Sequence, residues 1–387
     1  MDFSLSKSQK LIQNSARAFF EKECPKEKTR ALMQDPAGYD PSMWQKMVDL
    51  GFVGITIPEA FGGMQSEFTD LELLMEEMGR NIVPGPYFQT VCLCARALTL
   101  FGNEDQQQRY LPEIAEKGEI WSFALDETGV WKSPPDIRTR ATISDHGVIL
   151  NGTKVFVPYA RAADYMIVAA NTDTTVSPKA STTLLIVDTK TPGIEMEEIP
   201  TIGPGLKYAV TFNNVMVPAE NILGVAGNAM TMIDAFISEG ALLRAAEMSG
   251  GAQAALDLSL DYAKKRCQFD RPIGSFQVLQ HKLVKMLQEV DGLRNQVREA
   301  AWRITMGQSS PLLNAMAKTK ANTVYDRVCR DAVVIYGAIG WTAEMDVGLY
   351  LLRAKDLTYD CGSSDYHREK IATILMSATS GALATVA

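Results

Sequence analysis

Residues 279–304 read LQHKLVKMLQEVDGLRNQVREAAWRI, and the spacing of their apolar side chains decides the fold class of the C-terminal part of the chain. Apolar residues recur at steps that alternate between four and three, at Leu279, Leu283, Met286, Val290, Leu293, Val297, Ala300 and Ile304. A narrow apolar seam with this period is typical of a long helix that packs one face within a bundle. The stretch therefore predicts a long bundle helix, with Met286 as part of its core.

Outside this stretch, the chain divides into three zones with different periods of apolar residues. Residues 1–118 have the three- to four-residue spacing of helices, and residues 226–387 return to it. Residues 119–225 instead carry short apolar runs between turn signals, which is typical of strands. Because helices and strands occupy separate blocks, the sequence predicts an α+β fold with an N-terminal helical domain, a middle β domain and a C-terminal helical bundle domain.

Asn151-Gly152 is the strongest turn signal in the strand zone. Apolar runs lie on both sides of it, at 147–150 and 154–157. An Asn-Gly pair between two such runs predicts a β-hairpin with its turn at these two residues. Further buried strands are expected at 165–169, 184–187 and 209–212.

The composition argues against several classes of function. Of the 387 residues, 46% are apolar, and the net charge of −8 without a basic block argues against binding to nucleic acid or to anionic membranes. The six cysteines lack metal-finger spacing and only three histidines occur, so we expect reduced thiols and no metal site. The polar N-terminus and the lack of a membrane-spanning apolar stretch indicate a cytoplasmic protein. No G-x-G-x-x-G or P-loop opens a helix after a strand, so a nucleotide cofactor is not expected to bind as in a Rossmann fold.

Residues 266–277 read RCQFDRPIGSFQ and carry a recognisable motif. They resemble the R-x-x-F-G-x-x-I-x-x-F-Q stretch of the acyl-CoA dehydrogenases. Residues 335–340 (IYGAIG) resemble that family's Gly-rich turn between two late helices, and residues 57–63 (IPEAFGG) resemble its early I-P-E-x-x-G-G loop. Residues 126–128 (DET) stand where the family has T-E-P on the flavin side. The chain thus resembles the acyl-CoA dehydrogenases over its whole length, and in particular a bacterial branch in which some members form one half of an unequal pair of subunits.

The resemblance implies a fold, a reaction and a set of partners. It implies an N-terminal helical domain at 1–118, a β-barrel-like middle domain at 119–225 and a four-helix bundle at 226–387. It implies FAD as the cofactor and an acyl-CoA thioester as the substrate, with α,β-dehydrogenation in which a base removes the α-proton and a hydride moves from the β-carbon to the flavin. It also implies that an electron-transfer flavoprotein accepts the electrons, and that the assembly is a homotetramer or a heterotetramer with a related subunit.

The same resemblance places seven residues at the cofactor: Arg266, Phe269, Gln277, Leu125, Asp126, Phe156 and Gly337. Arg266 carries a planar cationic fork that suits a pyrophosphate, and by resemblance it reaches the FAD of a neighbouring subunit. Leu125 and Phe156 fit either a flavin contact or an ordinary strand core. Gly337 fits either a close approach to a ligand or a helix C-cap. The chain departs from the family pattern at Asp270, Ala338, Val334 and Pro158.

Neither of the family's two positions for the catalytic base holds a carboxylate in this sequence. The usual position, in the loop before the last helix, falls on Cys361, and a thiol is a poor base unless its pKa is depressed. Some relatives instead place a glutamate just before an arginine that matches Arg244, and this position falls on Leu243. A base, if present, must therefore come from a neighbouring residue.

Three carboxylates are candidates for that base: Glu247, Glu239 and Asp360. Glu247 leads because it lies one helical turn beyond Leu243 on the same face, although it also fits an ordinary bundle carboxylate. Glu239 lies one turn the other way, near the expected helix start, where it also fits a favourable charge in a first turn. Asp360 is adjacent to Cys361, but neighbouring side chains in an extended loop point to opposite sides, so Asp360 needs a local turn to act as the base. Burial beside an apolar acyl tunnel is expected to raise the pKa of the base.

Functions of two classes fit these residues. The first is a catalytic acyl-CoA dehydrogenase, which Glu247 favours. The second is a non-catalytic partner subunit that completes a cofactor site or shapes an assembly, which Cys361 at the usual base position favours. A flavin monooxygenase built on the same fold is a more distant third.

Overall fold

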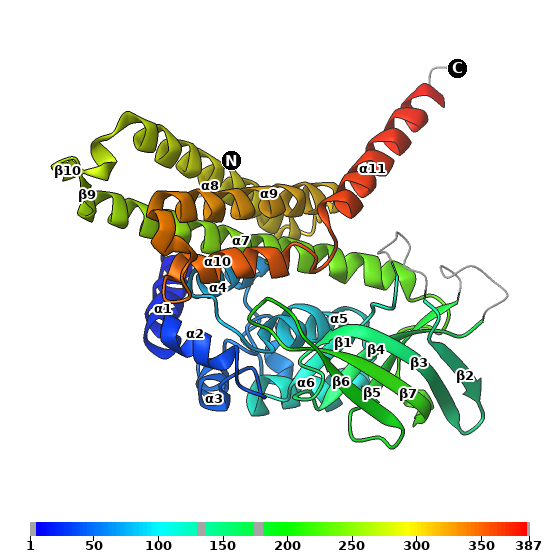
Figure 1. The fold of residues 1–387 in the computed structure, drawn as a ribbon. Helices are drawn as coiled ribbons and strands as arrows, with labels where there is room; N and C mark the ends of the chain where they lie inside the picture. Colours follow the sequence, from blue (N-terminus) through cyan, green and yellow to red (C-terminus); the bar gives the residue numbers. More distant parts are fainter. Residues whose placement is uncertain (1–4, 130–136, 174–180, 385–387) are drawn as a thin grey trace. The chain divides into compact units, whose positions relative to one another are not determined.

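The computed structural model describes residues 5–129, 137–173 and 181–384, which form helices and a large mixed sheet (Figure 1). The chain divides into two compact units. We call them the helical unit, which comprises Met1–Arg30, Glu67–Val83 and Ala241–Ala387, and the mixed unit, which comprises Ala31–Ser66 and Pro84–Gly240. The long helix α7 (Met230–Lys265) contributes residues to both.

Long helices make up the helical unit. α8 (Gln277–Thr305) confirms the helix predicted from the apolar seam, of which Leu283, Met286, Val290, Leu293, Val297 and Ala300 are buried. The unit also contains α1 (Lys7–Glu23), most of α2 (Lys26–Leu32), α4 (Phe68–Asn81), α9 (Pro311–Tyr336), α10 (Asp346–Leu357) and α11 (Ser364–Ala384). α9 packs against α8, α10 and α11, and α4 packs against α1 and α8. The helical character of the C-terminal zone is therefore confirmed.

Shorter helices lie in the mixed unit. They are α3 (Pro41–Asp49), the π-helix η2 (Phe88–Ala95), α5 (Arg96–Phe101) and α6 (Glu104–Lys117). α3 begins where the Asp40 side chain accepts a hydrogen bond from the backbone N–H of Ser42, with Pro41 in the first turn. α6 ends at Gly118, whose φ of 71° is left-handed. Local capping signals thus set these boundaries, and the N-terminal zone is helical as predicted.

Strands of the middle zone form one sheet in the mixed unit. The strands are β1 (Trp121–Ala124), β2 (Arg140–Ser144), β3 (Gly147–Pro158), β4 (Tyr165–Asn171), β5 (Thr182–Asp188), β6 (Ile194–Ile199), β7 (Lys207–Val217) and β8 (Ile222–Leu223). Their order is β6-β7-β3-β2-β4-β5-β8, and β1 pairs in parallel with β4. Buried aliphatic side chains such as Val148, Val168 and Val210 form the core of this sheet. The three further strands predicted from apolar runs lie within β4, β5 and β7, and the predicted α+β class is confirmed.

The hairpin turn predicted at Asn151-Gly152 is wrong. β3 runs through both residues as one strand paired with β7, and the pairing shifts register between Leu150 and Gly152. Gly152 has a φ of 141°, so its lack of a side chain permits a β-bulge inside the strand. The chain reverses earlier, between Ser144 and Gly147, which pair at the end of the β2–β3 ladder. Pairing with β7 therefore overrides the local turn signal.

All six cysteines are free thiols, and five of them have buried or partly buried side chains, whereas Cys267 is exposed. Within 5–129, 137–173 and 181–384, no helix is both long enough and apolar enough to cross a membrane. The same residues contain no group of three or more His, Cys, Asp or Glu side chains that could hold a metal ion.

Candidate active site

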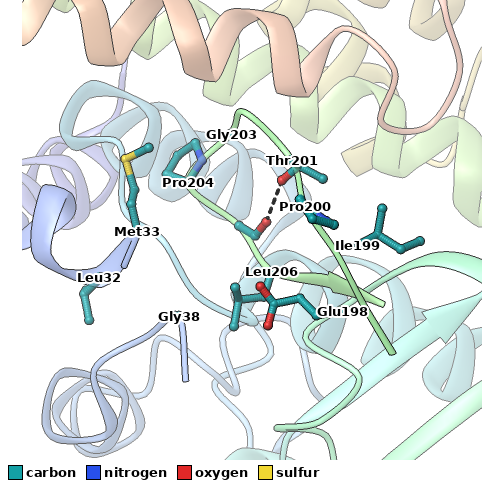
Figure 2. Close-up of a pocket in the computed structure, with 11 residues that line it drawn as sticks. Leu32, Met33, Gly38, Glu198, Ile199, Pro200, Thr201, Gly203, Pro204 and Leu206 are labelled. Carbon is teal, nitrogen blue, oxygen red and sulfur yellow. Dashed lines mark hydrogen bonds between the residues drawn. The ribbon is translucent and has the colours of Figure 1, made fainter. Parts of the chain in front are cut away.

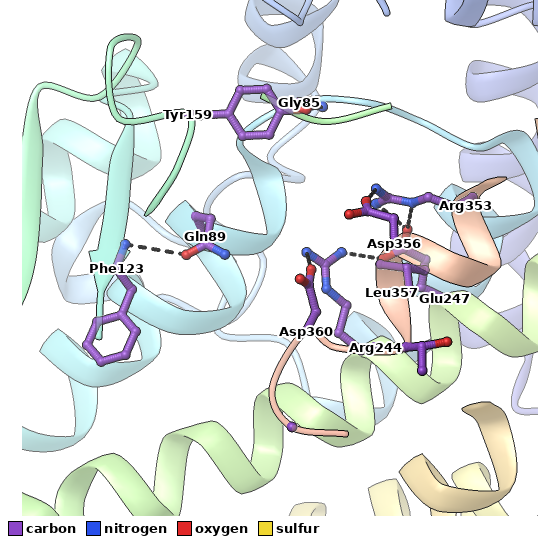
Figure 3. A network of polar contacts seen from close by, with 12 residues as sticks. Gly85, Gln89, Phe123, Tyr159, Arg244, Glu247, Arg353, Asp356, Leu357 and Asp360 are labelled. Atoms are coloured by element: carbon purple, nitrogen blue, oxygen red, sulfur yellow. Dashed lines mark hydrogen bonds and ion pairs between the residues drawn. The ribbon is translucent and has the colours of Figure 1, made fainter. Parts of the chain in front are cut away.

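The turn between α10 and α11 carries Asp360 and Cys361. Cys361 has a φ of 56°, in the left-handed region, so the chain turns locally at this point. The Asp360 carboxylate faces Arg244 of α7, and its Oδ2 lies 2.8 Å from Nη2 of that arginine (Figure 3). The Asp360 side chain is 16% exposed and so stays partly accessible. The local turn that Asp360 needs in order to serve as a base is therefore present.

Glu247 lies at the centre of a buried ion-pair network in the helical unit (Figure 3). Arg353 of α10 donates to its Oε1 from Nε and Nη2, at 2.9 and 2.6 Å, and Arg244 donates to its Oε2 from Nη1 at 2.5 Å. Arg353 also pairs with Asp356, at 2.9 Å. Burial by itself raises the pKa of the Glu247 carboxyl, but the charges of Arg353 and Arg244 outweigh it and hold that pKa below its ordinary value. The expected rise in the pKa of a buried base is therefore wrong for Glu247.

Glu239 belongs to the mixed unit and is held by a different arginine. α7 begins at Met230, so Glu239 lies about two and a half turns inside the helix, and its placement near the helix start is wrong. Arg96 of α5 donates to Glu239 Oε2 from Nε and Nη2, at 3.1 and 2.8 Å. Glu239 thus lies outside the first turn of α7, and its carboxylate forms a mostly buried ion pair.

A second buried cation lies on the inner side of the turn that carries Asp360. Lys318 of α9 is fully buried, and its Nζ donates to the main-chain oxygen of Leu357 at 2.9 Å and to Oδ1 of Asn322 at 2.6 Å. Longer contacts reach the carbonyl oxygens of Thr358, at 3.4 Å, and Gly362, at 3.5 Å. Burial lowers the pKa of Lys318 to about 8. One ammonium group thus binds the main chain at both ends of the turn.

The segment after β1, which was expected at the flavin, is fixed by another buried lysine in the mixed unit. Lys154 of β3 donates from Nζ to the main-chain oxygen of Leu125 at 3.1 Å and to Oε1 of Glu127 at 2.6 Å. Glu127 also accepts from the main-chain N–H groups of Arg138 and Thr139, at 2.8 and 3.0 Å. Burial would raise the pKa of Glu127, but Lys154 outweighs it and lowers that pKa. The buried pair therefore joins this segment to β3 and to the start of β2.

Leu125, Asp126 and Phe156 differ in their exposure. Leu125 is buried, and the main-chain oxygen of Asp126 accepts from the N–H of Val155 at 2.9 Å. Phe156 is 50% exposed and has a φ of 54°. The strand-core alternative is therefore wrong for Phe156, because a core side chain is enclosed by its neighbours. An exposed aromatic ring held at a sparsely populated backbone angle is available for a bound ligand.

The motif at 266–277 forms a tight hairpin in the helical unit. β9 (Cys267–Gln268) and β10 (Arg271–Pro272) pair in antiparallel fashion. Phe269 and Asp270 join them, with φ values of 54° and 61°. Two consecutive positive φ values are those of a type I′ turn, and aspartate tolerates this region better than most residues. Asp270 can therefore replace the family's usual glycine, and Phe269 at the tip is 86% exposed.

Arg266, Gln277 and Gly337 are also exposed in the helical unit. The side chains of Arg266 and Gln277 make no hydrogen bond or ion pair with any residue that the structure describes. Gly337 ends α9 with a φ of 70°, and its N–H bonds to the carbonyls of Val333 and Val334, as a C-cap does. A Cβ added at Gly337 meets no atom within 4 Å, so the space beside its backbone is open.

A pocket in the mixed unit lies apart from these residues. It has a volume of about 170 Å³ and is lined by Leu32, Met33 and the loop at 198–206 (Figure 2). Thr201 donates across this loop to the carbonyl oxygen of Gly205, at 3.3 Å. None of the residues predicted for the cofactor or the base lines this pocket.

Comparison with known proteins gives the family. Family models described as the acyl-CoA dehydrogenase N-terminal, middle and C-terminal domains match residues 6–118, 122–215 and 228–376. A relative from Bacillus subtilis, probable acyl-CoA dehydrogenase YngJ, is 33% identical over 383 residues, which cover 97% of this chain and 100% of the relative. The chain belongs to the acyl-CoA dehydrogenase family. This family consists of flavoprotein oxidoreductases that act on CH–CH bonds.

Solved structures share the fold of this acyl-CoA dehydrogenase family chain. Butyryl-CoA dehydrogenase from Megasphaera elsdenii is 30% identical, with a TM-score of 0.91 over 97% of this chain and 100% of that chain. A chain of the ChsE4-ChsE5 complex from Mycobacterium tuberculosis is 27% identical, with a TM-score of 0.87 over 97% of this chain and 99% of that chain. The resemblance found from the motifs is therefore confirmed at the level of the family.

The chemistry of the exposed donors fits the cofactor of the acyl-CoA dehydrogenases. FAD carries an anionic pyrophosphate, and Arg266 offers it a guanidinium fork that no other described residue engages. Gln277 offers an amide beside the same hairpin, and Gly337 leaves open space next to its main chain. In the mixed unit, the exposed ring of Phe156 offers a stacking surface.

Sequence reasoning missed three cations of this acyl-CoA dehydrogenase family chain: Arg353, Lys318 and Lys154. Arg353 lies 106 residues from Glu247, and Lys318 lies 44 residues from Gly362. A lysine or arginine in a helix or strand is normally solvated, so its type and position predict no buried partner. For Lys154 the sequence did contain one signal. It lies in a predicted strand, and because alternate side chains of a strand point to opposite faces, half of the residues in that strand are expected to point inward.

Proposed function

We propose that this chain catalyses the FAD-dependent α,β-dehydrogenation of an acyl-CoA thioester, with Asp360 as the base. The observation that carries the proposal is the position of Asp360, a partly accessible carboxylate in the turn directly before α11, ion-paired to Arg244. This is the segment in which the family usually carries its base. The left-handed backbone at Cys361 turns the chain, so Asp360 can take over from the residue that follows it.

The surroundings of the other two candidates favour anchoring roles. Glu247 is 2% exposed, and two arginines engage both of its oxygens. A carboxylate whose pKa is held low is a weak base, and proton transfer to it would break a buried ion pair. Glu239 is similarly bound to Arg96. We therefore assign Glu247 and Glu239 to the support of the fold and place Asp360 ahead of Glu247.

In the proposed reaction, each group of this chain has a defined task. Asp360 accepts the α-proton of the thioester, and Arg244 orients its carboxylate between turnovers. Arg266, Phe269, Gln277 and Gly337 hold FAD, and Leu125, Asp126 and Phe156 contact its ring system. When bound, FAD supplies the hydride acceptor. We propose an electron-transfer flavoprotein as the partner that reoxidises the enzyme.

The decisive experiment is anaerobic flavin reduction by a series of acyl-CoAs in the purified holoenzyme. Asp360→Asn should slow reduction by about 10²–10⁴-fold, the usual contribution of a general base, while FAD content stays unchanged. Asp365→Asn is the matched control, because Asp365 is an exposed aspartate in the first turn of α11 that pairs with Arg368. Reduction of Asp360→Asn at the parent rate would refute this assignment.

A second function, that of a non-catalytic partner subunit, is favoured by a specific observation. Cys361 occupies the family's usual base position and Leu243 occupies the other known position, so neither holds a carboxylate. The ChsE4-ChsE5 complex, to which this chain is similar, contains two different chains. A parent protein that is never reduced by any acyl-CoA, but is reduced after mixing with a related subunit, would support this function in place of the first.

Assembly, domain boundaries and location are part of the proposal. If Arg266 binds the FAD of a neighbouring subunit, the protein must be at least a dimer. We therefore propose a homotetramer or a heterotetramer with a related subunit. We propose domain boundaries near residues 118 and 225, and a cytoplasmic location. A monodisperse monomer in light scattering at micromolar concentration would contradict the proposed assembly.

A further inference from the structure

Four polar side chains from three helices bind the single turn that carries Asp360. Lys318 and Asn322 come from α9, Arg244 comes from α7 and His367 comes from α11. Lys318 donates to carbonyl oxygens before and after Asp360, at Leu357, Thr358 and Gly362. A short surface turn ordinarily leaves such carbonyls to water, so this degree of fixation by buried side chains sets the turn apart.

The other groups around Lys318 complete this fixation. Asn322 accepts from Lys318 through Oδ1 and donates through Nδ2 to the carbonyl of Thr358, at 3.3 Å, and to Oγ of Ser364, at 3.2 Å. His367 is buried and its Nε2 lies 2.9 Å from the carbonyl oxygen of Cys361. Buried side chains thus contact the main chain of residues 357, 358, 361 and 362 and the carboxylate of Asp360. Tyr359 is the one residue of the turn without such a contact in the part of the chain that the structure describes.

Charge explains why lysine rather than an apolar residue suits this position. Lys318 interacts electrostatically with the Cys361 thiol, with Asp360 and Glu247, and with Arg244. Two carboxylates favour the ammonium form, and the carbonyl dipoles of the turn point their oxygens toward it. An apolar side chain of similar length would leave these carbonyl oxygens buried without a donor, and the turn would lose the contacts that fix its path.

We infer that Lys318 is a positioning residue, which holds the turn in the conformation that presents Asp360 to the substrate α-carbon. This inference rests on the proposed function of Asp360. Lys318 itself touches no substrate. It acts through the main chain on either side of the base, while Arg244 acts on the carboxylate directly. Because catalysis loses efficiency steeply when a base is displaced, loosening the turn lowers the rate of proton removal more than it lowers substrate affinity.

The test uses Cys361 as a built-in reporter of the turn. Cys267 is exposed and the four remaining cysteines are buried, so a Cys267→Ser background leaves Cys361 as the accessible thiol. In that background, Lys318→Met holoenzyme should react with an aromatic disulfide reagent at least tenfold faster than its parent. Its maximal rate of anaerobic flavin reduction should fall at least tenfold, while the half-saturating acyl-CoA concentration changes less than threefold. Lys320→Met, the same substitution two residues along α9, is the matched control and should match the parent in both assays.

The outcomes separate this inference from the proposed function. If Lys318→Met leaves both the labelling of Cys361 and flavin reduction at the parent values, or speeds labelling without slowing reduction, the inference is overturned. If Asp360→Asn itself reduces flavin at the parent rate, the proposed function fails first. Should Lys318→Met not fold, Asn322→Leu removes the contact with Lys318 and the two contacts of Asn322 with Thr358 and Ser364, and intermediate effects on labelling and rate are expected. Parental behaviour of that variant would overturn the inference as well.

Discussion

Substitution of Glu247 by glutamine distinguishes a structural role of this residue in the ion-pair network from a role as the catalytic base. The change keeps the shape of the side chain but removes the charge that faces Arg353 and Arg244, at 2.6 and 2.5 Å. Removal of one partner from a buried ion pair typically destabilises a protein by about 3–5 kcal/mol. Because Asp356 and Asp360 still pair with the two arginines, we expect the low end, about 3 kcal/mol.

The assay is urea unfolding of the holoenzyme, followed by the loss of helical circular dichroism. With a slope of about 3 kcal/mol per molar urea, the expected loss lowers the midpoint by about 1 M. Glu299→Gln is the matched control, because Glu299 is a half-exposed helical glutamate paired with Arg303, and such a pair contributes about 0.3–0.5 kcal/mol.

The pH dependence of Glu247→Gln has a definite sign. The folded pKa of Glu247 lies below its ordinary value of 4.5, so its stabilising effect is fully present above about pH 4.5 and is lost as the pH falls through the folded pKa. The difference between parent and variant should therefore be constant near neutral pH and shrink in acid. A variant that unfolds at the parent's urea concentration, yet no longer reduces its flavin, would refute the reasoning and restore Glu247 as the base.

Three further predictions concern the cofactor, the mixed unit and the base. Arg266→Ala should purify with little FAD, measured as the ratio of flavin to protein absorbance, whereas the neighbouring variant Lys265→Ala should keep its FAD. Equal FAD content in both variants would contradict the assignment of Arg266 to FAD binding. Glu127→Gln leaves the ammonium of Lys154 buried without its counter-charge and should lower the free energy of unfolding in urea by about 3–5 kcal/mol. The double variant Lys154→Met,Glu127→Gln should recover part of that loss. A Glu127→Gln variant as stable as the parent would count against a structural role for the pair. In an Asp360→Asn background, Cys361→Glu should restore flavin reduction at least tenfold, since it returns a carboxylate to the same turn; no recovery would show that the turn cannot present a base from that position.

The sequence by itself determined the class of the fold and the family. The apolar seam at 279–304 predicted α8 because helical packing requires a local period, and a local period can be read without knowing the partner helix. The motif at 266–277, together with the shorter motifs at 57–63 and 335–340, resembles the acyl-CoA dehydrogenases, and such a resemblance between consecutive residues can be read without the structure. Where a local signal competed with pairing across the sheet, as at Asn151-Gly152, the sequence was misleading.

Only the tertiary structure decided the partners of the charged residues. Glu247, Glu239 and Asp360 are all carboxylates on or near helices, and the sequence does not show their surroundings. Their partners, Arg353, Arg96 and Arg244, lie 106, 143 and 116 residues away along the chain. A pKa depends on burial and on charges within a few ångströms, and neither quantity is fixed by position in the sequence. Folding brings these groups together, and it is that juxtaposition which buries Glu247 between two arginines and leaves Asp360 at the accessible edge of the network.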